Sequence, residues 1–265
     1  MTNTATESSG SSLFQSERQR EIAAATMQAG RVEVAELAVR YNVTTETIRR
    51  DLSDLQLHKV VRRVHGGAVP WETARFEPLL SRRSDQHDSE KQRIAAGAVA
   101  EIPDAGSIII DSGSTLSTFA QVVPMATSVR IVTNALNIAQ VLSERCDTDV
   151  IVIGGKVRKN TLAMVDSEAV AAVEPLAVDT LFISSDGLTA ANGLSTPYRE
   201  EAALKQAMIS AARRVVALVD HSKFGKEHFT RFAEWSDIDV LITNREADPT
   251  EVEAIEAAGT TVVLT

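Results

Sequence analysis

The sequence predicts two folded parts: a small helical part closed by a β-hairpin, then a larger α/β part built on a mostly parallel sheet. In the first 70 residues, short helical patterns end in a basic, β-branched run at residues 60–65. From residue 107 onward, short apolar runs alternate with alanine-rich helical stretches. This alternation is typical of a parallel sheet that helices cover on both faces.

The bulk composition is that of an ordinary globular protein. Its 265 residues suffice for one large or two moderate domains. The single cysteine, Cys146, excludes an internal disulfide and fits a reducing cytoplasm, where we expect the protein to reside. No apolar run approaches about 18 residues, so we expect no membrane span.

Four segments are expected along the chain. Residues 1–13 are rich in Ser and Thr and lack an apolar core, which indicates a disordered tail and not a signal peptide. We expect residues 14–69 to form the N-terminal domain and residues 89–265 to form the α/β domain. Residues 70–88 mix proline, aromatic and charged residues without an apolar period, which predicts a linker.

The net charge of −9 is distributed unevenly. Residues 1–70 contain nine Lys or Arg and eight Asp or Glu, whereas residues 71–265 contain 18 and 28. The acidic excess therefore lies outside the N-terminal part, as a local basic footprint for DNA requires. A module this weakly basic should bind non-specific DNA poorly and depend on a dimer for affinity.

Three helices and a hairpin are predicted at the N-terminus. Helical patterns cover residues 16–28, 34–41 and 45–56, and a tight turn at residues 42–43 precedes the third. The third helix has one apolar stripe, because Ile48, Leu52 and Leu55 are spaced at i, i+4 and i+7. Helix, short helix, turn, helix and basic hairpin together predict a winged helix-turn-helix.

The polar face of the third helix and the hairpin predict a surface for double-stranded DNA. Threonine hydroxyls can cap the helix, and two arginines beside small polar residues can reach base edges and phosphates. The basic hairpin would grip the sugar-phosphate backbone. The alternative is a solvated amphipathic helix followed by an ordinary hairpin. The predicted DNA-binding residues are Thr44, Thr45, Thr47, Arg49, Arg50, Ser53, Arg62, Arg63, His65, Gly66 and Gly67.

Three blocks of this region resemble the DeoR family of bacterial transcriptional regulators. The resemblance implies that the third helix enters the major groove while the hairpin contacts the backbone. Two positions depart from the family pattern: Lys59 replaces a glycine, and Leu57 is apolar where the family is polar. The blocks are Gly30-x-Val32-x-Val34-x-Glu36-Leu37-Ala38, Val43-Thr44-x-x-Thr47-Ile48-Arg49-Arg50-Asp51-Leu52 and Arg63-Val64-His65-Gly66-Gly67-Ala68.

Seven strands are predicted in the α/β part, and polar or glycine residues follow five of them. Ligands of such sheets bind beyond the carboxyl ends of the strands. After the first strand, a glycine flanked by hydroxyls offers amides and a helix start to an anion such as phosphate. Each turn alone has an ordinary steric explanation, but five together predict a binding site. The strands are residues 107–110, 129–133, 150–153, 180–183, 215–219, 240–243 and 261–264. The predicted site residues at or after the ends of these strands are Asp111, Ser112, Gly113, Ser114, Thr115, Thr133, Asn134, Gly154, Gly155, Lys156, Asp186, Gly187, Asp220 and Lys223.

These turns also resemble the sensor domain of the DeoR family, so the resemblance covers the chain from about residue 14. Family sensor domains are related to ribose-5-phosphate isomerase and bind phosphorylated sugars. The resemblance implies that residues 112–115 hold the phosphate, and that Glu201 with Lys205 line the pocket or pair with each other. It implies sugar or phosphate-edge contacts for Asp111, Asn134, Asp186 and Lys223.

Two departures from the family pattern bear on this site. Asp166 stands where the family has a glycine, and Ser184-Ser185 replaces a Gly-Ala type pair. Either change would shrink the pocket or add a hydrogen-bonding group.

A sugar-phosphate isomerase is the alternative, because the same fold and loops serve such enzymes. Asp111, Asp186, Glu201 and Lys205 would then move protons on an enediolate. The N-terminal DNA reader argues against it, since an isomerase needs none. The five histidines show no metal-ligand spacing, so we expect no metal, and no cofactor is implied.

The sequence as a whole predicts a transcriptional regulator and not an enzyme. We expect a cytoplasmic repressor of sugar-metabolism genes, located on the nucleoid when it binds its operator. Its effector would be a phosphorylated sugar. Operators of such modules usually match protein symmetry, so we expect a homodimer or homotetramer.

Overall fold

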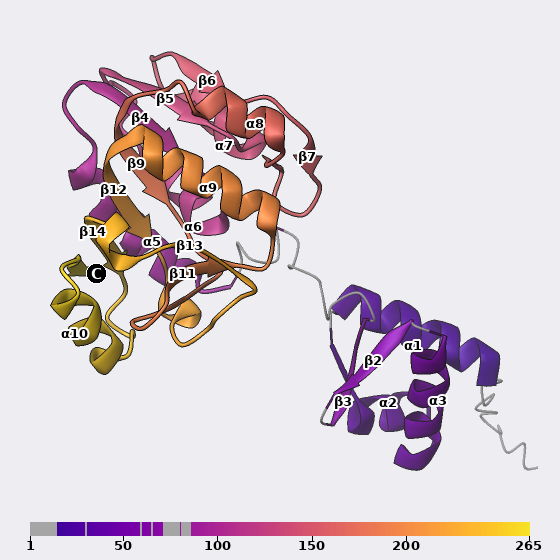
Figure 1. Ribbon diagram of the computed structural model, residues 1–265. Helices are drawn as coiled ribbons and strands as arrows, with labels where there is room; N and C mark the ends of the chain where they lie inside the picture. The colour runs from indigo at the N-terminus through magenta and orange to yellow at the C-terminus, as the bar shows by residue number, and fades with distance from the viewer. Residues whose placement is uncertain (1–14, 30, 59, 65, 71–79, 81–85) are drawn as a thin grey trace, which may run out of the picture. The chain divides into compact units, whose positions relative to one another are not determined.

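The computed structural model describes residues 15–29, 31–58, 60–64, 66–70, 80 and 86–265 (Figure 1). The chain divides into two compact units, Met1–Pro78 and Leu79–Thr265, and each has a hydrophobic core of its own. The predicted tail and most of the predicted linker lie outside the described residues. Within the predicted linker, Leu80 is buried in the second unit and its N–H donates to the carbonyl of Asn160 at 2.8 Å.

Unit 1 contains the predicted three helices and hairpin. Its small antiparallel sheet has the order β1-β3-β2, and the first of these strands was not predicted. The elements are α1 (Gln15–Ala29), β1 (Val32–Glu33), α2 (Val34–Arg40), α3 (Thr45–Leu57), β2 (Val61–Val64) and β3 (Gly67–Pro70).

Helix α3 forms where its residue pattern predicts. Its apolar stripe of Ile48, Leu52 and Leu55 is buried in the core of unit 1. Thr44 caps the helix, since its hydroxyl accepts a hydrogen bond from the Thr47 N–H at 3.1 Å. The turn before it needs a left-handed residue, which Asn42 provides with φ 50°.

A buried ion pair joins α1 to α3. Arg18 donates through Nε and Nη2 to the two carboxylate oxygens of Asp51, at 2.6 and 3.3 Å. Gln19 adds a hydrogen bond to Asp51 at 3.2 Å. The sequence pattern did not predict this pair, because the two residues are far apart along the chain.

Unit 2 is built on a seven-stranded parallel sheet with the order β15-β14-β12-β9-β4-β5-β6. All seven predicted strands are present, with ends that shift by at most a few residues. The strands are β4 (Gly106–Ile110), β5 (Val129–Thr133), β6 (Val150–Val152), β9 (Val178–Ile183), β12 (Ala212–Leu218), β14 (Val240–Thr243) and β15 (Thr261–Leu264).

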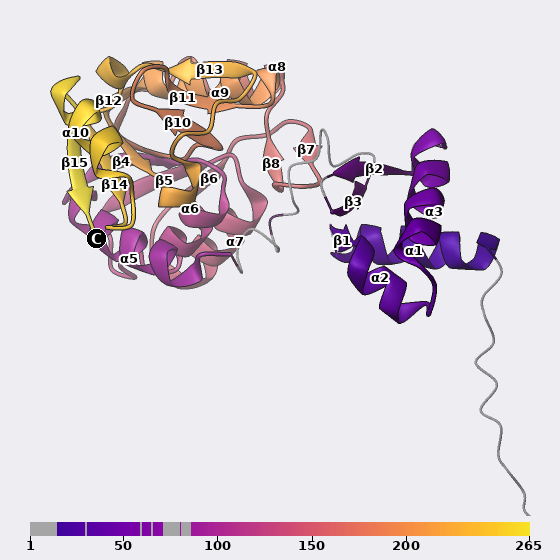
Figure 2. The same cartoon turned by 90° about the horizontal axis from the view of Figure 1, so that it is seen from below.

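Helices cover both faces of this sheet, as Figure 2 shows edge-on. Successive strand residues point to opposite faces, so Ile108 and Ile110 pack in one core and Ile109 in the other. The first core also takes residues of α5 (Asp88–Ala98), α6 (Ser114–Ala120) and α7 (Leu136–Arg145). The second core takes residues of α8 (Ser167–Val173), α9 (Arg199–Ala211) and α10 (Pro249–Ala257).

Two antiparallel additions at the sheet were not predicted from the sequence. Their strands are two to four residues long, which is too short for an alternating pattern to stand out. They are the pair β7 (Val157–Arg158) and β8 (Ala163–Met164), and the sheet β10 (Gly187–Thr189), β11 (Gly193–Thr196) and β13 (Thr230–Ala233). Short 3-10 turns complete the unit: η2 (Val99–Glu101), η3 (His221–Lys223) and η4 (Trp235–Asp237).

None of the described helices combines the length and the apolar character that a membrane crossing requires.

We predict that Arg18→Met destabilises unit 1 by about 3–5 kcal/mol, because it leaves the Asp51 carboxylate buried without its cation. Hydrogen–deuterium exchange of the full chain should show faster exchange in peptides from α1 and α3 and unchanged exchange in peptides from the parallel sheet. Gln15→Ala serves as the control, because it removes only an exposed hydrogen bond to Asp54. Equal exchange in the two variants would contradict a stabilising role for the pair.

Candidate DNA-binding surface and ligand site

The polar face of α3 is exposed, as a DNA-reading helix requires. Thr44, Thr45, Arg49 and Arg50 are exposed, and Thr47 is half-buried. Arg49 lies 3.3 Å from Glu46, one turn earlier, in an exposed ion pair. Such a pair stabilises the helix by well under about 1 kcal/mol, so Arg49 can leave it for a base or a phosphate.

The hairpin is joined to α3 through Arg63. The Arg63 side chain donates to the Ser53 hydroxyl at 2.8 Å, and its backbone N–H donates to the Gln56 side chain at 2.9 Å. Ser53 in turn donates to the Arg49 carbonyl at 2.7 Å. Arg63 and Ser53 therefore orient the hairpin against the helix, while Arg62 is exposed beside them.

The two glycines of the hairpin have different surroundings. Gly66 is exposed in the turn with φ 77°, a left-handed conformation that favours glycine. Gly67 is buried against β1, where an added Cβ would lie 2.0 Å from the Val32 carbonyl oxygen. Gly67 is therefore needed for the pairing of β1 with β3, and only Gly66 is placed at the surface. The predicted contact residue His65 lies outside the described residues.

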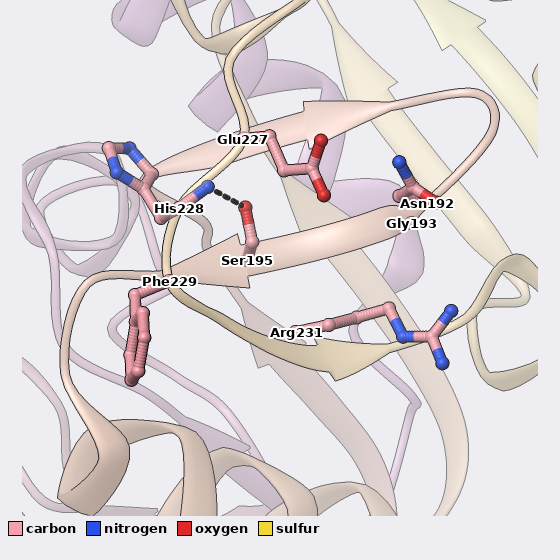
Figure 3. Close-up of a pocket in the computed structure, with 7 residues that line it drawn as sticks. All are labelled: Asn192, Gly193, Ser195, Glu227, His228, Phe229 and Arg231. Carbon is pink, nitrogen blue, oxygen red and sulfur yellow. Dashed lines mark hydrogen bonds between the residues drawn. The ribbon is translucent and has the colours of Figure 1, made fainter.

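Two hollows lie on the surface of unit 2. One, of about 170 Å³, is lined by β11, β13 and the segment before β13, including Ser195, His228, Phe229 and Arg231 (Figure 3). The other, of about 560 Å³, lies between α8 and α9 and includes Asp166. The sequence indicated neither hollow, because their lining residues come from elements that pack together only in the fold.

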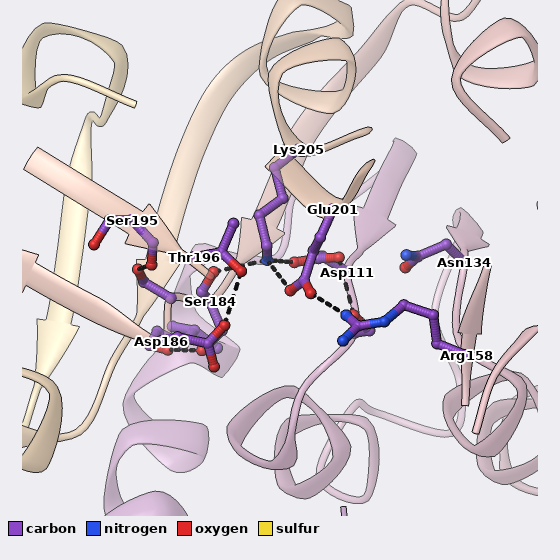
Figure 4. Close-up of polar contacts among 12 residues, drawn as sticks. Asp111, Asn134, Arg158, Ser184, Asp186, Ser195, Thr196, Glu201 and Lys205 are labelled. Carbon is purple, nitrogen blue, oxygen red and sulfur yellow. Dashed lines mark hydrogen bonds and ion pairs between the residues drawn. The ribbon is translucent and has the colours of Figure 1, made fainter. Parts of the chain in front are cut away.

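Lys205 is the centre of a buried charged network at the ends of the parallel strands (Figure 4). Its ammonium group donates to the Asp111 carboxylate and, at 2.9 Å, to the Ser184 carbonyl. Burial would lower the pKa of Lys205, but the nearby carboxylates of Asp111, Glu201 and Asp186 outweigh burial and raise it. Lys205 is therefore a protonated donor at neutral pH.

Glu201 extends this network toward the β7–β8 pair. One of its carboxylate oxygens lies 3.7 Å from the Lys205 ammonium, and the other accepts a hydrogen bond from Arg158. The Arg158 guanidinium also stacks 3.9 Å from the centre of the Tyr198 ring. The sequence prediction included Glu201 and Lys205 but missed Arg158, which belongs to an unpredicted two-residue strand.

Asn134 presents a buried acceptor at the same edge. Its side-chain Nδ2 donates to the Met164 carbonyl at 3.2 Å. Among the described residues, its buried Oδ1 has no hydrogen-bond partner, and neither has the buried Oγ1 of Thr161 between β7 and β8. A buried unsatisfied polar atom costs about 1–3 kcal/mol, which a bound donor would recover.

The turn after β4 is compact. Ser112, Ser114 and Thr115 are buried, and Gly113 adopts φ 140°, where another residue would be strained. Ser112 donates weakly to Asp111 at 3.4 Å. Ser114 and Thr115 are the first two residues of the seven-residue helix α6.

Other predicted residues have hydrogen-bond partners that are not members of the Lys205 network. Gly154, Gly155 and Lys156 are exposed, and the Lys156 N–H donates to Asp166 at 2.7 Å. Asp220 lies after β12 and accepts from the Ser222 N–H at 3.0 Å, with the charges of Lys223 and Lys91 nearby. Thr133 is buried and its hydroxyl accepts from the Ala135 N–H at 3.2 Å.

Among the residues that depart from the family pattern, Lys59 lies outside the described residues and those of unit 2 have structural partners. Asp166 caps α8 by accepting from the Ala169 N–H at 3.0 Å. The Ser184 hydroxyl donates to the Leu218 carbonyl, and the Ser185 hydroxyl donates to carbonyls of β10 and β11. These hydrogen bonds hold the turn after β9, where Asp186 accepts from Thr196 at 3.0 Å and Gly187 begins β10.

Two family models match the chain. The DeoR-like helix-turn-helix domain matches residues 18–74, and the DeoR C terminal sensor domain matches residues 86–245.

Similar proteins extend over nearly the whole chain. The HTH-type transcriptional regulator GlpR of Haloferax volcanii is 34% identical over 251 residues, which are 95% of this chain and 98% of that protein. The glycerol-3-phosphate regulon repressor of Escherichia coli is 30% identical, over 88% of this chain and 92% of that protein. Among solved structures, the sorbitol operon regulator SorC of Klebsiella pneumoniae aligns with a TM-score of 0.41 and 10% identity, over 90% of this chain and 98% of that chain. Ribose 5-phosphate isomerase A of Neisseria gonorrhoeae aligns with a TM-score of 0.41 and 17% identity, over 54% and 56%. The family models and the close sequence relatives show that the chain belongs to the DeoR family of DNA-binding transcriptional regulators.

Proposed function

We propose that this protein represses genes of sugar metabolism and that a phosphorylated sugar controls its DNA binding. One observation carries the proposal: the same chain has exposed arginines on an anchored helix and a buried charged network with unsatisfied acceptors at the strand ends. A relative named for the glycerol-3-phosphate regulon supports the class of effector.

Helix α3 would read the operator in the major groove. Arg49 and Arg50 reach outward from a helix whose opposite face is buried, so they can donate to base edges and phosphates. Arg62 would contact the backbone from the hairpin, and Arg63 would keep the hairpin in register with α3. Because operators of such modules are usually two-fold symmetric, we infer a homodimer or homotetramer.

The charges of the network indicate which end of the effector it binds. Asp111, Glu201 and Asp186 outnumber the two cations Lys205 and Arg158, so the network suits hydroxyl groups better than a phosphate. The side-chain Oδ1 of Asn134 would accept from one of those hydroxyls. The phosphate would lie at residues 112–115, whose amides begin α6, or beside Lys223.

A bound effector changes DNA affinity only if it prefers one state of the protein. A preference of about 1–3 kcal/mol gives a switch of useful size. The ligand would act by shifting the population between DNA-competent and incompetent arrangements. The network can supply such a preference, because its residues come from α9 and from the turns after β4 and β9. A ligand bound to it would therefore contact several elements at once.

We predict that Arg49→Ala weakens operator binding by about 1–3 kcal/mol if the guanidinium contacts a base. The measurement is fluorescence anisotropy at fixed salt, with an operator selected from a random oligonucleotide pool. Arg213→Ala is the matched control, because it removes an equal charge from an exposed position in unit 2. Wild-type affinity in Arg49→Ala would remove this residue from the reading surface.

We predict that one phosphorylated sugar stabilises the full chain in a thermal-shift screen while its unphosphorylated parent does not. A ligand at a hundred times its Kd stabilises by about 2.7 kcal/mol. Ser114→Ala should weaken that ligand by about 1.5–3 kcal/mol, the value of a hydrogen bond to a charged group, and leave DNA binding unchanged. Ser210→Ala, at an exposed position of α9, should bind the ligand normally. Loss of DNA and ligand binding together in Ser114→Ala would indicate misfolding.

We predict no turnover of ribose 5-phosphate by the purified protein. Lys205 is protonated and donates to Asp111 and to the Ser184 carbonyl, so it cannot remove a proton from the sugar. The assay is chromatographic detection of the isomerised sugar after prolonged incubation. Product formation above the level of a Lys205→Met variant would favour the isomerase alternative.

A further inference from the structure

Two histidines and a glutamate from distant parts of unit 2 meet at the start of α5. His87 directly precedes α5, Glu90 lies in its first turn, and His221 begins η3 after β12. One ligand atom from each residue lies within 4.8 Å of the other two. The His87 Nδ1 and a Glu90 carboxylate oxygen are 3.7 Å apart, which is too far for a hydrogen bond.

The backbone and a neighbouring amide hold the two rings in place. His87 adopts φ 55° and ψ 40°, a left-handed conformation that is uncommon for histidine, and its side chain does not cap α5. Asn244 lies 2.8 Å from Nδ1 of His221 and also accepts from the His221 N–H. The two rings meet edge to face, with centroids 4.9 Å apart.

We propose that His87, Glu90 and His221 bind one divalent transition-metal ion such as Zn²⁺. Two imidazoles and one carboxylate suit zinc, cobalt and nickel, whereas magnesium and calcium prefer oxygen ligands alone. A fourth position would hold water. The donor atoms must approach to roughly 3.3 Å of one another around a tetrahedral ion. The exposed His87 and half-buried Glu90 side chains can close that distance by rotation.

Asn244 determines which ring nitrogen of His221 can bind the metal. The His221 backbone N–H donates to Oδ1 of Asn244 and fixes the amide, so Nδ2 faces Nδ1 of His221 and donates to it. The neutral ring then carries its proton on Nε2, and Nδ1 has the lone pair for the metal, which would replace the hydrogen bond from Asn244. Any proton on an imidazole that binds the metal is released to solvent, so affinity should fall at low pH.

The ion would link two segments that the chain separates widely. One is the residue where the chain enters α5, and the other is η3, which also contains Lys223 next to Asp220. Both of these residues belong to the predicted effector site. Occupancy of the metal site would therefore hold η3 against α5 and stiffen one side of that site.

The test is a titration of the metal-free full chain with Co²⁺ at pH 7.5, followed by visible absorption and by competition with Zn²⁺. We expect one ion per chain with the intense absorption of four-coordinate cobalt. His87→Ala and His221→Ala should each weaken binding by about tenfold or more. His228→Ala is the matched control, because it removes a half-buried histidine of the same unit outside the cluster.

Glu90→Gln provides a second variant if either alanine variant fails to fold, since it keeps the side-chain shape. It should also weaken Co²⁺ binding, with an unchanged circular dichroism spectrum. Wild-type affinity in His87→Ala, His221→Ala or folded Glu90→Gln would overturn the site. Failure of the full chain to bind Co²⁺ or Zn²⁺ below about 1 mM would overturn it as well.

Discussion

The buried ammonium group of Lys205 constrains the arrangement of unit 2 at the carboxyl ends of its parallel strands. A buried charge is tolerated only when it is paired and hydrogen-bonded. The turn after β4 therefore has to bring Asp111 to it, and the turn after β9 has to present the Ser184 carbonyl. Helix α9 is held over the ends of two neighbouring strands as a result, and Glu201 comes within reach of Arg158. The fold alone thus arranges this charged network.

In unit 1, a buried ion pair positions the helix that carries the exposed arginines. Arg49, Arg50 and Asp51 are consecutive, and helix geometry turns the two arginines to solvent and the aspartate into the core. There Asp51 pairs with Arg18 and fixes α1 against α3. A rigid support matters here, since base recognition requires side chains held in place. The Ser53–Arg63 hydrogen bond extends that support to the hairpin.

Much of the fold and part of the site could be predicted from local patterns. Continuous apolar runs such as residues 215–219 are visible in sequence because strands buried on both faces need apolar residues throughout, and the stripe of α3 is visible because one buried face imposes a helical period. The strands β1, β7, β8, β10, β11 and β13 were missed, since each either has only two residues or mixes apolar residues with polar ones and glycine, so none forms a continuous apolar run. Arg158 was missed with them, as were the lining residues of the 170 Å³ hollow, Phe229 and Arg231 among them.

The sequence by itself determined the two-part organisation, the alternation of strands and helices that makes the sheet parallel, and the residue types that follow each strand. It determined these because secondary structure and turn chemistry depend on neighbours along the chain. Only the tertiary structure decided which of those residues meet. It joined Lys205 to Asp111, left Lys156 exposed, turned Gly67 to a packing role, and brought His87 to His221. Such contacts depend on the packing of elements that are distant in sequence, which no local pattern records.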